Sequence, residues 1–398
     1  MRYLVIKVKY RMKLPFCPST PRLSSILRFT VFLASTMLVA AFPIVINAES
    51  ALPSSGLINP RAIAYDPATG KVYAVDTSHA AVLIYSTAGG QTRHVTVGEY
   101  PISIAVNPKN GRAYVANGGD GTVTVLDGNS DAVVATVSVG SHPYSVAASP
   151  SSGKVYVTHT FGDQLSVIDG LTNAVADVKT GSSDLVAINP RKGTVYLLGY
   201  GGAVKVLDEA SSKFVEIPVG RHGWGLTLND ATGALYIARI ESADLAAIEP
   251  GSSSSVIISV GEIPCAIAVN AAGDRLYVAN YGDDTVTVID ASAQRKIAVV
   301  PVGRHPKAIA FDPIRSLVYV ANTGDGTVTV IDAATNGAVA TLPAGKNPFA
   351  LAVVPGSNSL YVANESDSDP STVVDLTGVR TPNPQERPAT SNPQCRPA

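Results

Sequence analysis

The chain has 398 residues, of which 46% are apolar and 15% carry a charge. This apolar fraction excludes a chain that is disordered throughout, and 34 glycines with 27 prolines favour an all-β protein with many tight turns. Six histidines and three cysteines leave little material for a multi-site metalloenzyme and exclude a disulfide framework.

The first 48 residues are expected to be a signal peptide. Residues 29–46 form an uncharged stretch that follows seven basic residues and no acidic one, and Ala48 supplies a small residue at the cleavage point. This order is typical of a secretory leader. An uncleaved membrane anchor is the alternative, because eighteen apolar residues are just enough to span a bilayer, but Pro43 within the stretch favours cleavage. We therefore expect an exported protein, located in the periplasm, at the cell surface or in the medium.

Cleavage after Ala48 would leave 23 basic and 31 acidic residues, a net charge of −8. A nucleic-acid-binding protein normally presents a net basic surface, so the mature chain is not expected to bind DNA or RNA. Cys265 lies in an apolar segment and is expected to be a core residue.

One unit of about 41 residues recurs eight times along the chain. Each copy is marked by a tyrosine in the motif YVAN or a variant of it, and successive tyrosines are 40 to 42 residues apart. Self-similarity at a period of this length indicates a repeat architecture. The eight tyrosines are Tyr73, Tyr114, Tyr156, Tyr196, Tyr236, Tyr277, Tyr319 and Tyr361.

The second copy, residues 101–140, shows the plan of each unit. It contains an Ile-Ala-Val segment at 104–106, the YVAN strand at 114–117, an alternating β-branched strand at 122–126 and a last strand at 134–139. An Asn-Pro-x-x-Gly turn and a Gly-Asp-Gly turn separate the first three strands, because proline presets one φ angle and glycine accepts a positive one. The alternation predicts four short strands, and no segment shows helical periodicity.

Tandem four-stranded units of this length predict an all-β protein, a single β-propeller in which each blade covers its neighbour. Eight copies predict eight blades, with seven blades and a displaced terminal unit as the alternative. The last copy lacks a fourth strand and residues 51–53 resemble residues 341–343, so we expect an N-terminal strand to close the ring. The propeller should span residues 49–379, followed by a disordered, proline-rich tail at 380–398. Crowding near the axis is expected to explain a small residue on every first strand, namely Ala64, Ala105, Ala147, Ala187, Thr227, Ala268, Ala310 and Ala352.

The YVAN strand, the segment GDGTVTVID at 324–332 and the closing Val-Gly-x-x-Pro resemble the YVTN-repeat β-propeller family. The likeness covers nearly all of residues 51–378. It implies an exported or cell-surface propeller, as in surface-layer-type proteins, commonly with seven blades. It implies no single activity, since related rings hold haem d1, copper clusters or lactonase metal sites, and a fold does not decide function.

One loop position is the candidate for a binding rim. In a propeller, the loops from the outermost strand of one blade to the innermost strand of the next (connecting loops) share a face with the loops between second and third strands (second–third loops); we call this the loop face. The candidate position lies two residues after the glycine that ends the outermost strand. Three of the six histidines occupy it, and the single tryptophan, Trp224, lies two residues after one of them. The position holds Tyr100, His142, Ser183, His222, Ile263, His305 and Asn347.

Two interpretations of these residues are open. A metal or cofactor pocket held by His142, His222 and His305 is one, because imidazoles are common metal ligands. A polar binding rim is favoured, because the other blades carry no carboxylate at this position and alternate blades lie on the order of 10 Å or more apart. We therefore predict no metal and no cofactor. The predicted rim comprises Tyr100, His142, His222, Trp224, Tyr281, His305 and Asn347.

No catalytic motif is found. The sequence has no G-x-S-x-G elbow and no C-x-x-C-H haem attachment, and Asp120, Asp283 and Asp325 lack the ligand spacing of a calcium loop, which indicates turn aspartates that hold backbone N–H groups. The prediction is a monomeric, non-enzymatic scaffold whose loop face binds a protein or glycan of the cell envelope, with no membrane span after signal cleavage. The alternative is a periplasmic metal- or cofactor-dependent enzyme, lactonase-like or redox-type, with a site in the central channel.

Overall fold

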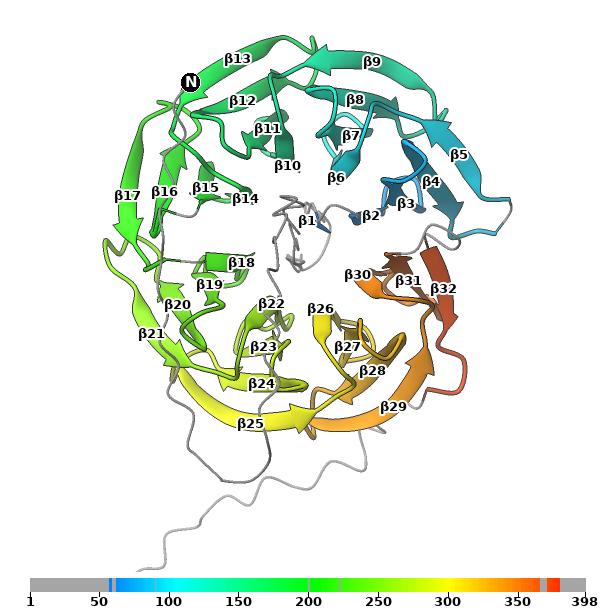
Figure 1. Cartoon of the computed structure of the whole chain (residues 1–398), viewed down its shortest axis with the longest axis vertical. Coiled ribbons are helices and arrows are strands. Elements are labelled where there is room, and N and C mark those ends of the chain that lie inside the picture. The colour runs from blue at the N-terminus through cyan, green and yellow to red at the C-terminus, as the bar shows by residue number, and fades with distance from the viewer. Residues whose placement is uncertain are drawn as a thin grey trace, which may run out of the picture. The chain divides into compact units, whose positions relative to one another are not determined.

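The computed structural model describes residues 57–58, 62–89, 91–199, 201–221, 223–365 and 371–379, all within the unit formed by residues 41–398. These residues contain strands and no helix, and the strands form eight antiparallel sheets arranged in a ring (Figure 1). The chain is therefore an all-β, eight-bladed propeller, as predicted, and the seven-blade alternative is wrong. The predicted signal peptide and the predicted disordered tail lie outside the described residues.

Blades are numbered in chain order, and each sheet is built outward from the ring's inner rim. The innermost strands are β2 (Ile63–Asp66), β6 (Pro101–Asn107), β10 (Pro143–Ala148), β14 (Leu185–Asn189), β18 (Gly223–Leu228), β22 (Pro264–Val269), β26 (Pro306–Asp312) and β30 (Pro348–Val353). The second strands are β3 (Lys71–Asp76), β7 (Arg112–Asn117), β11 (Lys154–His159), β15 (Thr194–Leu198), β19 (Leu235–Arg239), β23 (Arg275–Asn280), β27 (Leu317–Asn322) and β31 (Ser359–Asn364). The third strands are β4 (Ala81–Ser86), β8 (Thr122–Asp127), β12 (Gln164–Asp169), β16 (Ala203–Asp208), β20 (Asp244–Ile248), β24 (Thr285–Asp290), β28 (Thr327–Asp332) and β32 (Ser371–Asp375). The outermost strands of blades one to seven are β5 (Arg93–Thr96), β9 (Val133–Ser138), β13 (Val175–Lys179), β17 (Phe214–Pro218), β21 (Val256–Ser259), β25 (Arg295–Pro301) and β29 (Gly337–Pro343).

The repeated tyrosine explains the small residue on each innermost strand. The two are directly opposite in every blade, as Ala105 and Tyr114 are in blade two and Thr227 and Tyr236 in blade five. Residues directly opposite in a sheet point to the same face, so a small partner leaves room for the aromatic ring. The strand register therefore explains the small residue directly, whereas the sequence had suggested only crowding at the axis.

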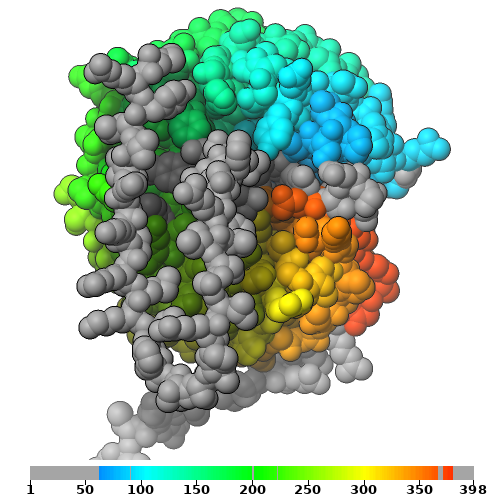
Figure 2. Space-filling model, viewed as in Figure 1, coloured from blue at the N-terminus to red at the C-terminus, as the bar shows by residue number. Residues whose placement is uncertain are grey.

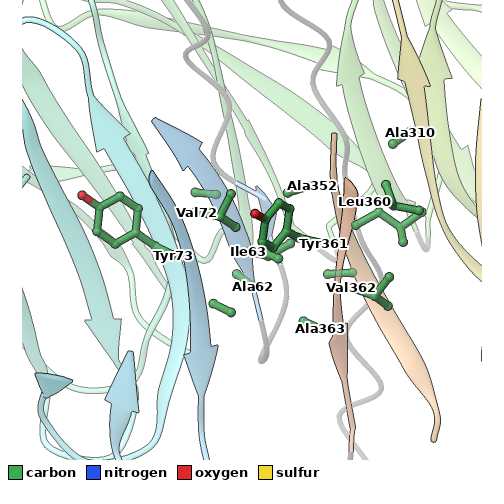
Figure 3. Packing of buried hydrophobic residues seen from close by; sticks show 14 of the residues in the cluster. Ala62, Ile63, Val72, Tyr73, Ala310, Ala352, Leu360, Tyr361, Val362 and Ala363 are labelled. Atoms are coloured by element: carbon green, nitrogen blue, oxygen red, sulfur yellow. The ribbon is translucent and has the colours of Figure 1, made fainter. Parts of the chain in front are cut away.

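Blades one and eight meet through side chains. Tyr361 of β31 packs in one buried apolar cluster with Ile63 of β2, and Figure 3 shows the two side by side. The ring of Tyr85 lies 5.5 Å from that of Tyr361, and its hydroxyl hydrogen-bonds the hydroxyl of Ser371. In Figure 2 the orange and red atoms of blade eight lie beside the blue atoms of blade one.

The described N-terminal strand belongs to blade two. Blade eight has three described strands, and residues 51–53, which were expected to add the fourth, lie outside the described residues. The described N-terminal strand, β1 (Leu57–Ile58), instead pairs with β6, with Leu57 opposite Ile104 and Ile58 opposite Ser103. It extends blade two to five strands at the inner rim (Figure 1). Within the described residues, no helix is long and apolar enough to cross a membrane.

Candidate functional site on the loop face

The connecting loops and the second–third loops lie on the same face and hydrogen-bond each other. In blade two, the amide of Gly119 donates to the carbonyl of Glu99 at 2.9 Å, and the amide of Glu99 donates to the carboxylate of Asp120 at 2.9 Å. Asp283 and Asp325 accept the equivalent amides in blades six and seven, at 2.8 and 2.6 Å. The interpretation of these aspartates as holders of backbone N–H groups is confirmed.

A second set of contacts anchors each connecting loop from below. In blade two, Asn117, the last residue of the YVAN motif, donates to the hydroxyls of Thr122 and Thr124 at 2.9 Å. The Thr124 hydroxyl accepts the amide of Gly98 in the connecting loop at 3.3 Å. We call this arrangement the loop clamp. Blades six and seven repeat the asparagine–threonine bonds with Asn280 and Asn322.

The predicted rim position has left-handed backbone geometry. The φ angle is +52° at Tyr100, +53° at His142, +50° at Ile263, +53° at His305 and +52° at Asn347. Such a conformation costs on the order of 1–3 kcal/mol for a residue other than glycine, and it persists only where the surrounding structure imposes it. The side chains are exposed or half-exposed. The position is therefore a backbone feature of the repeat, distributed around the loop face.

The three predicted histidine ligands are not seen together. His222 lies outside the described residues. The ring of His305 stacks on that of Tyr281, with centroids 4.6 Å apart and an interplanar angle of 11°. Among the described residues, no three His, Cys, Asp or Glu side chains gather as metal ligands. The metal site of His142, His222 and His305 stays an alternative interpretation.

The structure singles out a position that the sequence interpretation largely missed. In six blades the innermost strand begins with a β-bulge, one residue being skipped in the pairing with the second strand. Bulges redirect side chains and are common next to active sites. Of the bulged residues, the sequence had pointed to Tyr144 and Trp224 as loop residues and to Cys265 as a core residue; in five of the six blades the available signal was the residue after the loop proline. The bulged residues are Ile102, Tyr144, Trp224, Cys265, Lys307 and Phe349.

Bulged residues of neighbouring blades contact each other. The ammonium of Lys307 lies 3.8 Å from the ring centroid of Phe349, a cation–π contact between two buried side chains. The thiol of Cys265 donates to the carbonyl of Pro306 at 3.2 Å, and burial raises its pKa to about 12. Together with the stacked pair of Tyr281 and His305, these residues form a continuous group across blades six to eight.

His159 and Ser166 in blade three resemble a catalytic pair but act as a loop clamp. The buried His159 ring contacts the Ser166 hydroxyl at 2.9 Å and the carbonyl of Ser141 in the connecting loop at 3.0 Å. Ser166 donates to Asp177 at 2.7 Å. In a catalytic triad the carboxylate binds the imidazole, whereas here it binds the hydroxyl. Burial lowers the pKa of His159, against the opposing effects of the Ser141 carbonyl and Asp177.

Blade four departs most from the repeat. Its connecting loop is one residue shorter, and β14 pairs with β15 without a bulge. The clamp is replaced by Lys205, whose ammonium donates to the carbonyl of Ser182 at 3.1 Å. Asp184, at the start of β14, is half-buried, and this burial raises the pKa of its carboxyl to about 6 against the opposing effects of Thr160 and Lys205. A carboxyl group titrating in this range is a common property of functional sites.

The fold defines the class of the protein, a β-propeller. Comparisons with known proteins add a family match over part of the chain and two similar structures. The family "Lactonase, 7-bladed beta-propeller" matches residues 203–369, from the third strand of blade four into blade eight. Hydrazine synthase from Kuenenia stuttgartiensis is 20% identical with a TM-score of 0.55, over 72% of this chain and 99% of that chain. The dihydro-heme d1 dehydrogenase NirN in complex with DHE is 17% identical with a TM-score of 0.61, over 71% and 66%. At these identities the two structures show the shared fold. No curated protein matches the chain significantly.

The family match corrects the functional prediction. A non-enzymatic scaffold was expected because no catalytic motif was found, but the matching family is named for an enzymatic activity. The comparison contradicts the scaffold and favours the alternative, an enzyme of lactonase type. The prediction failed for a physical reason: the repeated motif describes what every blade needs to fold, and chemistry resides in the residues by which single blades differ.

Proposed function

We propose that this chain is a hydrolase that opens a cyclic ester, with its site on the loop face at the inner rim. The observation that carries the proposal is the match of residues 203–369 to a lactonase propeller family. The match spans three complete blades and parts of two others, so it rests on the repeated blade sequence together with its loops.

The groups on the loop face support this chemistry. Ester hydrolysis needs a base that accepts a proton from water and a positive or N–H-bearing group near the developing oxyanion. The described loop face offers the exposed imidazoles of His142 and His305 and the half-buried carboxyl of Asp184. It also offers the ammonium of Lys307, held over an aromatic ring at 3.8 Å.

The test is hydrolysis of δ-valerolactone and γ-butyrolactone by the purified protein, followed as proton release above the spontaneous rate. We expect turnover that saturates with substrate. The rate should be measured before and after exhaustive dialysis against a chelator, with elemental analysis of both samples, since the three-histidine alternative predicts a stoichiometric metal and its loss. A folded protein with no turnover of either lactone would refute the proposal.

Two finer assignments belong to the same proposal. The YVAN-type repeats support membership of the YVTN-repeat propellers, and the basic-then-apolar N-terminus supports export with cleavage after Ala48. Mass spectrometry of the protein recovered from the extracytoplasmic fraction should find a chain that begins at Glu49. Recovery of the protein only in the cytoplasm, with its first 48 residues intact, would contradict export.

A further inference from the structure

We propose that the hydrolytic centre lies at the seam between blades three and four, where the Asp184 carboxylate acts as the general base. This inference rests on the proposed function and locates it. At this seam the sequence departs most from the repeat. The connecting loop is one residue shorter, the bulge is missing, and a lysine replaces the loop clamp. Sequences depart from local structural rules mainly at functional or strained positions.

Asp184 is held between the two blades by its backbone. Its amide donates to the carbonyl of Leu198 in β15 at 2.8 Å, and its carbonyl accepts the hydroxyl of Thr158 in β11 at 2.8 Å. Thr158 therefore fastens the start of blade four to blade three. The preceding residue, Ser183, forms an isolated bridge with His159 of the same strand. The carboxyl group is thus presented by a main chain fixed on both sides, which a positioned base requires.

Two buried serine hydroxyls at this seam have no hydrogen-bond partner among the described residues. Ser183 is 1% exposed and Ser145 of β10 is fully buried, and neither Oγ makes a hydrogen bond within the described part of the chain. The equivalent of Ser145 in blade two, Ser103, accepts the amide of Val146 from the next blade at 3.2 Å. A buried hydroxyl without a hydrogen bond destabilises the fold. Two of them beside a half-buried carboxyl indicate a place where a polar ligand or a reacting water supplies the missing bonds.

The carboxyl has the titration behaviour that a general base needs. Burial raises the pKa of Asp184 to about 6, near the pH at which the group must both ionise and accept a proton. Lys205 is the charged group that acts on it, and it favours the carboxylate. The Lys205 ammonium is fixed by its bond to the Ser182 carbonyl at 3.1 Å, so its charge stays next to the carboxyl.

The reaction balances with water as the only co-reactant. The Asp184 carboxylate accepts a proton from water while the water oxygen bonds to the ester carbonyl carbon. The ring C–O bond then breaks, and the departing oxygen takes the proton from Asp184 and leaves as an alcohol. The product is a hydroxy acid that releases one proton to solvent, and Asp184 is again a carboxylate.

The test uses Asp184→Asn in the full-length protein, with Asp163→Asn as the matched control. Asp163 lies in the second–third loop of blade three, 69% exposed, and pairs with Lys179 at 3.5 Å. With δ-valerolactone as substrate, Asp184→Asn should lower kcat/KM by at least about 100-fold, the usual contribution of a general base, whereas Asp163→Asn should not. The wild-type kcat/KM should fall as the pH drops through about 6. In Lys205→Gln this limb should move to higher pH, because the charge that favours the carboxylate is gone.

Ser183→Ala separates a functional role from a structural one. Removing an unpartnered hydroxyl should leave the unfolding midpoint unchanged or higher, while kcat/KM for δ-valerolactone falls about tenfold if the hydroxyl pairs with substrate or water. An active wild type with Asp184→Asn within threefold of it would overturn this location and leave the lactonase proposal standing. An inactive wild type would overturn both. A fall in stability for Ser183→Ala with an unchanged rate would also overturn the location.

Discussion

Tyr156 and Tyr277 occupy the same position in blades three and six, but their hydroxyl groups have different surroundings. The Tyr156 hydroxyl donates to Oε1 of Glu209 at 2.9 Å, whereas that of Tyr277 is buried without a partner in the described residues. Burial raises the pKa of both phenols, that of Tyr277 to about 12. Substitution of tyrosine by phenylalanine at either position therefore removes one heavy atom, the hydroxyl oxygen.

The hydrogen bond determines the expected difference. A hydrogen bond to a charged group contributes about 1.5–3 kcal/mol to stability. Glu209 keeps the hydroxyls of Ser152 at 3.0 Å and Ser151 at 3.3 Å when Tyr156 is changed, so we expect the lower end, about 1.5 kcal/mol. Tyr277→Phe removes a hydroxyl that has no bond to lose, and we expect no loss of stability or a gain of up to about 1 kcal/mol.

Equilibrium urea unfolding followed by tyrosine fluorescence and circular dichroism measures both variants against the wild type. Equal slopes of the unfolding free energy against urea would show that the change is one of stability. Comparable losses in the two variants would refute the reasoning, since the phenol's partner would then not be the cause. A gain for Tyr156→Phe would refute it as well.

Three further predictions concern the scaffold. A Cβ at Gly261 would overlap the carboxylate of Asp283, so Gly261→Ala should lower the free energy of unfolding by about 1–3 kcal/mol in urea titrations; Gly201, with no atom within 4 Å of such a Cβ, is the control. Hydrogen bonds from its own turn lower the pKa of Asp127, which stabilises the fold above the carboxyl's unfolded pKa. Asp127→Asn should therefore be less stable than wild type at pH 7, with the difference closing as the pH falls below about 3.9 and through the lowered pKa of the folded protein. A difference that widened toward acid pH would contradict this sign. Cys265 is fully buried with a raised pKa, so its reaction with a thiol reagent should follow global unfolding, and rapid labelling of native protein would show that the core opens locally.

The fold was predictable because every blade repeats the residues that form its strands and turns through contacts within the blade. The tyrosine that marks the period is also the residue that fills the blade, opposite a small residue such as Ala105. Turn aspartates such as Asp120 were correctly interpreted, since their bonds reach only the adjacent loop. The predicted closing strand at residues 51–53 has less support from the sequence, because pairing between chain ends depends on contacts far apart in sequence.

The site proposed from the structure differs from the rim predicted from the sequence. The rim position of Tyr100 and His142 was chosen because it lies on the loop face and three histidines occupy it, but its side chains are set by a strained backbone shared by the blades. The bulged position of Lys307 lies two residues further on, and a bulge has no signature in a single sequence. Asp184 was overlooked because its loop was one residue short, although this irregularity was visible.

The junction of blades one and eight has a mechanical consequence. Every other pair of neighbouring blades is joined by continuous backbone, whereas the first and last blades share no sheet in the described residues and meet through Tyr85, Tyr361 and Ser371. A force applied between the start of β2 and the end of β32 would act on this junction before either blade unravels. The ring would then open at this junction while its individual sheets stay intact.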